Sequence, residues 1–499
     1  MFASLGAYGH LYPMMPLALA CADAGHEVVI ATGKPFLDRL PLPTVPGYPI
    51  TLEIAWAIQE ARQRHPDLQG AELSMAMFAD VTAEQVAPTM IEQCERLRPD
   101  LVIFEGMDTG AGVAASVLGI PSAAYAIGLM SSVYGMLHPA TIRYRHDMWL
   151  QRDRTPPDGN NLLAGALINP APPSLGRTDG IGTPTIPIRP VAYNESSAGV
   201  PPWLTGKRVR PRVYLTLGTV AFGAVEVLSR AIAEIAPLDV DILVTVGPEG
   251  EPAALGEVAT TVHIERFVAQ SAVLPLVDLI VHHGGTGTVL GALEVGLPQL
   301  LLPQGADQFI NAEILTARGI GRALPNNAQQ PGAIGDAVQV LLGDSAERQA
   351  AGRVRDEIAA MPSPSDVVPA LVELAKRRDG PCACRRPLSL SKGAFARLGR
   401  LRILHPEPDL ERDLEMLDLA IDKMTADVGD LEPIEATKGA GRATHSDADG
   451  VVDSLLGRPD DLRQPVHVAA HDFLLRLVGV PSLGARVIWH WRLSRPRTW

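Results

Sequence analysis

Short apolar runs alternate with stretches of helical periodicity over residues 1–126. Runs rich in Val, Ile, Leu and Phe are typical of buried strands, and a helix between two such strands completes a βα unit. The pattern predicts strands at 1–5, 27–32, 100–104 and 122–126, and helices at 12–24, 83–96 and 110–118. Strands that alternate with helices predict an α/β fold with a parallel sheet.

A second α/β pattern follows a proline-dense connection from Pro156 to Pro211. Proline breaks helices and removes a donor from strands, so few regular elements are expected there. The second pattern predicts strands at 212–217, 241–246, 279–282 and 299–302, and helices at 225–235, 288–295, 308–318, 334–342 and 367–378. We expect the last of these helices to close the second domain. The predicted division is an N-terminal domain at 1–200, a C-terminal domain at 201–379 and a tail at 380–499.

The tail differs in character from the rest of the chain. It opens with a basic run, contains an amphipathic stretch at 410–428 and loses its pattern around 437–450. A helical appendage, a disordered partner-binding arm and a translation artefact all agree with this pattern, and the residues alone do not choose among them.

Composition narrows the class of protein. Of the 499 residues, 46% are hydrophobic and 20% charged, and the net charge is −13. A nucleic-acid-binding protein normally carries a basic face, so that partner is disfavoured, and anionic ligands must be held by local devices such as backbone amides. The four cysteines suggest no disulfide framework, and no apolar run is long enough to span a bilayer. These features favour a soluble protein of the reducing cytoplasm.

The most informative segment is 280–290, which reads IVHHGGTGTVL. An apolar strand ends in two histidines, a glycine-rich turn follows, and a helix begins at once. Glycines let a backbone approach an anion closely, and a helix N-terminus offers unpaired amides and the positive end of its dipole. Thr286 and Thr288 add hydroxyl donors, which predicts a diphosphate site. The alternative is an ordinary tight turn between a strand and a helix. The loop lacks the Gly-x-Gly-x-x-Gly pattern and the P-loop lysine.

Four motifs in fixed order carry a family resemblance: FVAQ at 267–270, HGGTGT at 283–288, GLP at 296–298 and PQGADQ at 303–308. Together they are similar to the donor signature of nucleotide-sugar glycosyltransferases, which include plant UDP-glycosyltransferases and antibiotic glycosyltransferases of actinomycetes. A weaker resemblance covers most of 1–378, and the tail lies outside it. The resemblance implies the GT-B fold, in which two Rossmann-like domains face each other.

The resemblance also implies roles for the donor-binding residues. Phe267 would stack on the nucleobase, which Val268 would contact through its backbone. His283, Gly285, Thr286, Gly287 and Thr288 would form the diphosphate loop, and Asp307 and Gln308 would hydrogen-bond the sugar hydroxyls. Thr219 matches a further phosphate-facing hydroxyl, for which a helix cap is the alternative reading.

On the acceptor side, His10 lies between the first strand and the first helix. A histidine at the carboxyl end of a strand can deprotonate an acceptor hydroxyl, because its pKa lies near neutrality. Gly9-His10 also matches the catalytic base of the family. The base needs a carboxylate partner, and the family's aspartate is replaced here by Glu105, with Asp108 three residues on. We favour Glu105 over Asp108 as the partner.

These features predict an inverting, metal-independent hexosyltransferase that needs no cofactor and acts on a nucleotide sugar and a small apolar acceptor. Segment 126–144, rich in Met, Tyr and Ile, would help to form the acceptor pocket. A non-catalytic binding protein and a nucleotide-sugar epimerase are the alternatives, and a homodimer is left open. Residues after about Arg378 are expected to be dispensable for catalysis.

The donor nucleotide is predicted from one position. Relatives that use UDP-sugars carry a glutamate for the ribose hydroxyls eight residues after the phosphate-binding histidine, where this chain has Gly291. Deoxyribose lacks the 2′-hydroxyl, so a carboxylate beside it would lose one partner. Glycine there favours a dTDP-deoxyhexose donor; the alternative is that it merely relieves packing.

Overall fold

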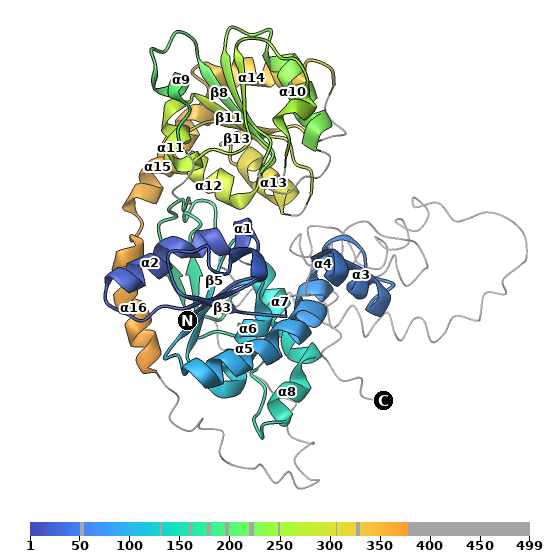
Figure 1. Ribbon diagram of the computed structural model, residues 1–499, viewed down its shortest axis with the longest axis vertical. Coiled ribbons are helices and arrows are strands. Elements are labelled where there is room, and N and C mark those ends of the chain that lie inside the picture. The colour runs from blue at the N-terminus through green and yellow to red at the C-terminus, as the bar shows by residue number, and fades with distance from the viewer. Residues whose placement is uncertain are drawn as a thin grey trace, which may run out of the picture. The chain divides into compact units, whose positions relative to one another are not determined.

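The computed structural model describes residues 1–49, 54–129, 132–158, 162–176, 181–194, 199–218, 224–247, 250–305, 307–325 and 330–377 (Figure 1). The predictions for the tail at 380–499 and for Thr219 lie outside these residues. Among the helices that are described, none is long and apolar enough to cross a membrane.

The first sheet is parallel throughout. Its strands, within the described part of the chain, follow the order β3-β2-β1-β4-β5-β6-β7. They are β1 (Phe2–Ala3), β2 (Ile30–Thr32), β3 (Thr44–Pro46), β4 (Val102–Glu105), β5 (Ser122–Tyr125), β6 (Ala166–Asn169) and β7 (Thr185–Pro187). Strand β1 lies between β2 and β4, with Phe2 opposite both Ile30 and Ile103. The loops that follow β1 and β4 therefore leave the sheet at the same edge.

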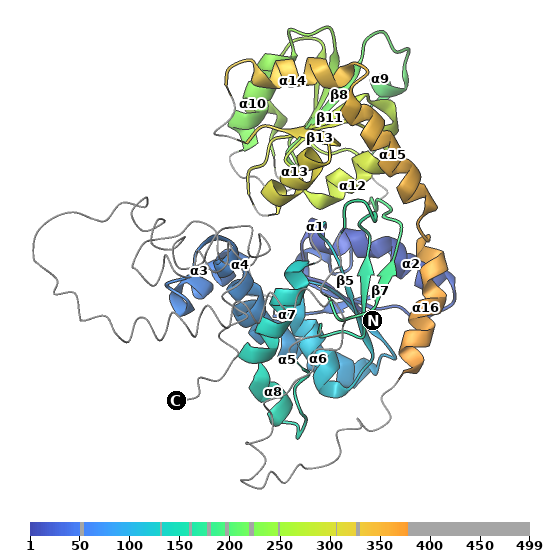
Figure 2. The same cartoon turned by 180° about the vertical axis from the view of Figure 1, so that it is seen from behind.

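Helices cover both faces of this sheet (Figure 2). Successive strand residues point to opposite faces, so Phe2 and Ile103 enter one apolar core while Ala3 and Phe104 enter another. The helical segments of this part are α1 (Tyr8–Leu11), η1 (Tyr12–Met14), α2 (Met15–Asp23), η2 (Lys34–Phe36), α3 (Ile54–Arg64), α4 (Gly70–Ala76), the π-helix η3 (Met77–Thr82), α5 (Ala83–Leu97), α6 (Thr109–Leu118), α7 (Ser132–Tyr144), α8 (His146–Leu150) and, from the end of the described chain, α16 (Pro364–Lys376). Helices α5 and α6 pack on the face of Phe104, and α2 packs on that of Phe2.

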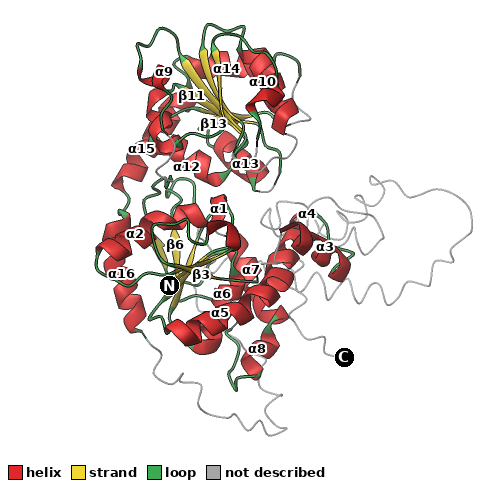
Figure 3. Cartoon of the chain, viewed as in Figure 1, coloured by secondary structure: helices red, strands yellow, loops and turns green. Residues whose placement is uncertain are grey.

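The second sheet is also parallel, with the described strands in the order β10-β9-β8-β11-β12-β13. They are β8 (Arg212–Thr216), β9 (Asp241–Thr245), β10 (Val262–Glu265), β11 (Leu279–His282), β12 (Gln299–Leu301) and β13 (Gly321–Ala323). The helical segments are α9 (Pro202–Thr205), α10 (Ala224–Ile235), η4 (Pro252–Leu255), α11 (Gln270–Val273), η5 (Leu274–Leu276), α12 (Thr286–Glu294), α13 (Gln308–Ala317), α14 (Ala333–Leu342) and α15 (Ala346–Ala360). Figure 3 shows both sheets between helices, which confirms the α/β prediction.

Helix α16 contradicts one expectation. The helix predicted at 367–378 does not close the second domain, because its apolar side chains join the core of the first sheet beside α2. Val367, Val368, Leu371 and Leu374 form the contact face. Helical spacing identifies such a face, but it carries no information about which sheet the face will cover. The boundaries proposed at 200/201 and 379/380 stay predictions.

The proline-dense connection is more regular than expected. Strands β6 and β7 and the short helix α9 lie within it. Strand β7 ends at Pro187 and forms an edge of the first sheet, which is where a strand tolerates proline. The proline content predicted little regular structure here. Strand β7 forms because it pairs with β6 at the edge of the sheet.

Candidate active site

The loops after β1 and β4 bring His10 and Glu105 together. His10 lies in α1, so the first helical turn begins at Tyr8, earlier than predicted, and Glu105 is the last residue of β4. His10 Nδ1 lies 2.8 Å from Glu105 Oε2. The Glu105 side chain is fully buried, and that of His10 is 23% exposed. A carboxylate only accepts hydrogen bonds, so Nδ1 of a neutral His10 carries the hydrogen and Nε2 keeps a lone pair.

Asp108, the alternative partner, does something else. It is the N-cap of α6, where its Oδ1 accepts a hydrogen bond from the Ala111 amide at 3.4 Å. Burial, reinforced by the nearby Glu105 charge, raises the pKa of Asp108 to about 8. Asp108 is therefore largely protonated at neutral pH, and the carboxylate in contact with His10 is Glu105.

The charge around His10 favours its protonated form. Burial by itself lowers the pKa of His10, but the charge and hydrogen bond of Glu105 outweigh it, and the Asp307 charge acts in the same direction as Glu105. The net result is a pKa above the ordinary value of 6.5. An imidazole in this setting binds a proton readily and stabilises it once bound.

The glycine-rich loop joins β11 to α12. Gly284 adopts a left-handed φ of 97°, and α12 begins at Thr286, two residues earlier than predicted. The first amides of a helix have no partner within it, so those of Thr286, Gly287 and Thr288 point out of the N-terminus. A Cβ at Gly287 would meet no atom within 4 Å, which leaves open space beside these amides.

His283 is fixed by two glycines. A Cβ at Gly218 would lie 2.5 Å from its Cε1, and one at Gly285 would lie 2.4 Å from its Nε2. Its Nδ1 is buried and has no hydrogen-bond partner among the described residues. Burial lowers the pKa of His283 to about 4, although Asp307 opposes the shift. His283 is therefore neutral at pH 7, with an unpartnered ring nitrogen at the start of α12.

Asp307 and Gln308 begin α13 and lie beside this loop. Asp307 is exposed, and its Oδ2 accepts a hydrogen bond from the Thr286 hydroxyl at 2.9 Å. Gln308 is buried, and its Oε1 accepts from the amides of Gln304 and Gly305. The side-chain oxygen of Gln308 thus holds the preceding loop.

The two residues predicted to contact the nucleobase differ in exposure. Phe267 is 40% exposed, as a ring that stacks on a ligand must be, whereas Val268 is buried in the core of the second sheet. Val268 could therefore contact a ligand only through its backbone, as the resemblance implied.

Comparisons with known proteins agree with this arrangement. The model of the erythromycin biosynthesis protein CIII-like family matches with its N-terminal domain at residues 19–218 and with its C-terminal domain at 229–374. The chain belongs to this family of glycosyltransferases. The L-demethylnoviosyl transferase of Streptomyces niveus is 33% identical over 74% of this chain and 97% of that protein. The 10-deoxymethynolide desosaminyltransferase of Streptomyces venezuelae is 31% identical over 77% and 99%.

Solved structures give the same result. The glycosyltransferase SnogD from Streptomyces nogalater superposes with a TM-score of 0.62 at 27% identity, over 75% of this chain and 98% of that one. The glycosyltransferase VinC, solved in complex with dTDP, superposes with a TM-score of 0.61 at 26% identity, over 75% and 99%. The recognised family, the GT-B fold and the assignment as a hexosyltransferase are therefore confirmed.

Sequence reasoning missed several residues that support the site of this glycosyltransferase. His138, on α7, is buried and donates from Nε2 to the Gly106 carbonyl at 2.9 Å, directly after Glu105. Its Nδ1 accepts from the Leu163 amide, and burial lowers its pKa to about 4. No sequence pattern indicates this role, because His138 and Glu105 lie on different elements.

His282 and Asn311 support the donor side of the glycosyltransferase in the same way. His282 Nε2 bonds Gln299 Oε1 at 2.9 Å, and its Nδ1 accepts from the Gly284 amide at 3.1 Å. Burial lowers the pKa of His282 to about 3. Asn311 donates to the Gly284 carbonyl from α13. The HH pair in the sequence signalled a site, but not that the first histidine shapes the turn while Nδ1 of the second has no hydrogen-bond partner among the described residues.

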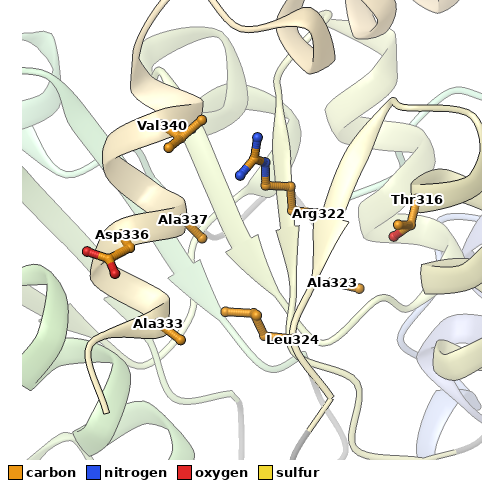
Figure 4. A pocket seen from close by; sticks show the side chains of 8 residues that line it. All are labelled: Thr316, Arg322, Ala323, Leu324, Ala333, Asp336, Ala337 and Val340. Carbon is orange, nitrogen blue, oxygen red and sulfur yellow. The ribbon is translucent and has the colours of Figure 1, made fainter. Parts of the chain in front are cut away.

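A surface hollow of the glycosyltransferase lies apart from these residues. It is lined by Thr316 from α13, by residues at β13 and by one face of α14 (Figure 4). Arg322, in its wall, pairs through Nε with Glu347 Oε1 at 2.7 Å. None of the predicted catalytic or donor-binding residues lines this hollow, so we assign it no part in the reaction.

Proposed function

We propose that this enzyme transfers a deoxyhexose from a dTDP-sugar to a hydroxyl group of a natural-product aglycone, with inversion at the anomeric carbon. The observation that carries the proposal is the 2.8 Å contact between His10 Nδ1 and Glu105 Oε2. It leaves Nε2 of His10 as a base. The charge of Asp307, beside the donor loop, contributes to the raised pKa of this base.

In the proposed reaction His10 Nε2 removes the proton of the acceptor hydroxyl. The oxygen forms a bond to the anomeric carbon while the bond from that carbon to the diphosphate oxygen breaks. Attack from the face opposite the leaving group inverts the anomeric configuration. The buried Glu105 carboxylate stabilises the imidazolium that forms, as a third group does in other base-assisted reactions.

The leaving diphosphate would be stabilised by the start of α12. The open space beside Gly287 suits a close approach of phosphate oxygens to the first-turn amides. Neutral His283 lies next to this loop, with its ring held against Gly218 and Gly285. Fixed dipoles that face a developing charge supply much of the rate enhancement in reactions of this type.

The dTDP specificity is supported by Gly291 and by relatives. A Cβ at Gly291 would lie 3.2 Å from Leu274 Cδ1. Packing against Leu274 therefore also favours glycine at this position, so the donor assignment draws on the relatives as well. VinC and the rhamnosyltransferase SpnG, a second solved relative at 26% identity, were solved with dTDP, and a relative from Streptomyces peucetius is a TDP-daunosamine transferase.

Two measurements test the proposal. Calorimetric titration with dTDP and UDP should show tighter binding of dTDP; a clear preference for UDP would overturn the donor assignment but not the glycosyltransferase. Mass spectrometry with a panel of dTDP-hexoses and aglycones should show product only when both substrates are present. Donor conversion without an acceptor would indicate an epimerase instead. Inversion is checked from the anomeric proton coupling of the product by NMR.

A further inference from the structure

Two threonines of the donor loop, Thr286 and Thr288, are two residues apart in the first turn of α12, yet their hydroxyls face different partners. The sequence assigned both to the diphosphate. In the structure Thr286 Oγ1 lies 2.9 Å from Asp307 Oδ2 and 3.0 Å from Asn311 Nδ2. Thr288 Oγ1 has a different neighbour, Gln270 Nε2, at 3.5 Å.

The direction of the hydrogen bonds at Thr286 is fixed by chemistry. A carboxylate only accepts, and an amide nitrogen only donates. The single hydroxyl hydrogen of Thr286 must therefore point to Asp307, while its oxygen accepts from Asn311. A phosphate oxygen needs a donor, and Thr286 has no hydrogen left to give. At Thr288 the neighbour is an amide that donates, so the hydroxyl hydrogen stays available for a phosphate.

Asn311 completes the arrangement from α13. It is 1% exposed, and its Nδ2 lies 2.9 Å from the Gly284 carbonyl and 3.0 Å from Asp307 Oδ2. The two hydrogens of Nδ2 face three acceptors, because Thr286 Oγ1 also lies 3.0 Å away, so one hydrogen is shared between Thr286 Oγ1 and Asp307 Oδ2. Oδ2 of the exposed Asp307 carboxylate is thus held by the Thr286 hydroxyl and by this shared hydrogen. Among the described residues no donor reaches the other oxygen, Oδ1.

We propose that Thr286 and Asn311 are positioning residues that act through Asp307. They fix Oδ2 so that Oδ1 faces the hydroxyls of the donor sugar, and Thr286 thereby ties the diphosphate loop to sugar recognition. Thr288, by contrast, contacts the diphosphate itself. The inference rests on the proposed nucleotide-sugar donor and deepens it.

The test separates sugar recognition from diphosphate recognition. Affinities for dTDP and for the tightest member of a dTDP-hexose panel are measured by calorimetry for the wild type, Thr286→Val and the matched control Thr288→Val. Thr286→Val should weaken dTDP-hexose binding by about tenfold, the effect of one charge-assisted hydrogen bond, and leave dTDP binding within about threefold. Thr288→Val should weaken both ligands to the same extent. Thr286→Ser should restore the wild-type ratio.

A second comparison uses Asp307, whose exposed side chain can be removed without disturbing a core. Asp307→Ala alone and with Thr286→Val should have nearly the same effect on dTDP-hexose affinity, because residues in one network are not additive. If Thr286→Val weakens the binding of dTDP and of dTDP-hexose equally, the inference is overturned but the proposed donor is not. The same holds if the effects of the two substitutions are fully additive in the double variant. A wild type that binds no dTDP overturns the proposed donor, and the inference with it.

Discussion

In the second sheet the donor loop is one continuous stretch from His282 to Thr288, whereas in the first sheet the His10–Glu105 pair joins residues 95 positions apart. Both sites lie where parallel strands end, but they use different chemistry. The donor loop presents backbone amides at the start of α12. The first-sheet pair depends on two side chains, one from the helix that follows β1 and one from the end of the neighbouring strand β4.

Different kinds of substitution should therefore impair the two sites. At the donor loop an added Cβ is harmful, because Gly285 and Gly218 leave no room beside His283. At the first-sheet pair we expect the loss of a side chain to be harmful, because the imidazole and the carboxylate are the groups proposed to carry the chemistry. The predictions below test this contrast, from the largest effect to the smallest.

The largest effect is expected at His10. His10→Ala removes the base, so kcat should fall by about 10²–10⁴-fold, the usual contribution of general base catalysis. Binding of dTDP should change little, since the donor loop does not include this side chain. Steady-state kinetics and calorimetry check both points, and near-wild-type turnover would refute the assignment of His10.

A smaller effect is expected at Glu105. Neutral His10 is the active form, so activity should rise as pH increases through its pKa, which Glu105 holds above 6.5. Glu105→Gln removes the charge and lowers that pKa, so the acidic limb of the kcat/KM profile should move to lower pH. The plateau should fall by about tenfold to hundredfold, because the imidazolium is less stabilised. An unmoved acidic limb would show that Glu105 does not control the base.

The donor loop is tested by adding a Cβ atom at Gly285. In Gly285→Ala the Cβ would lie 2.4 Å from His283 Nε2, so the ring must move and dTDP affinity should fall by about tenfold. Gly352→Ala, inside α15 with nothing near the new Cβ, is the control. It should leave binding unchanged and favour the helix by about 0.5–1 kcal/mol. If both variants bind dTDP like the wild type, the loop does not depend on its glycines.

The smallest effect concerns stability in acid. Burial lowers the folded-state pKa of His138 to about 4 from an ordinary value of 6.5, so below pH 6.5 the unfolded chain binds a proton that the folded chain does not. The contribution of neutral His138 to the free energy of unfolding is therefore complete above pH 6.5 and is lost as pH falls toward 4. His138→Gln, which does not titrate, should show a shallower loss of unfolding free energy over this range. Urea titrations at several pH values measure it, and an unchanged slope would contradict the pKa.

The sequence predicted the local features of the donor loop more accurately than the contacts between distant elements of the first sheet. Residues 279–294 were predicted nearly as they are, because strand, glycine turn and helix are local features and the strand is buried on both faces. Segment 126–144 was predicted, from its Met, Tyr and Ile content, to help form the acceptor pocket, which stays a prediction. Helix α7 in fact fixes the turn after Glu105, through His138 and through Tyr134, whose ring fills the space a Cβ at Gly106 would need. That contact joins separate elements, and no spacing within either one reveals it.

By itself the sequence determined that the chain forms two parallel α/β sheets, that a glycine-rich turn and a helix follow the strand at 279–282 and that His10 comes soon after the first strand. These are short-range properties, set by hydrophobic periodicity and by glycine. Only the tertiary structure decided that Glu105 rather than Asp108 contacts His10, that the Thr286 hydrogen points to Asp307 while Thr288 keeps its own, and that α16 packs on the first sheet. Each of these depends on the direction in which a side chain or a helix face meets a partner distant in the chain, and that direction exists only after the sheets have packed.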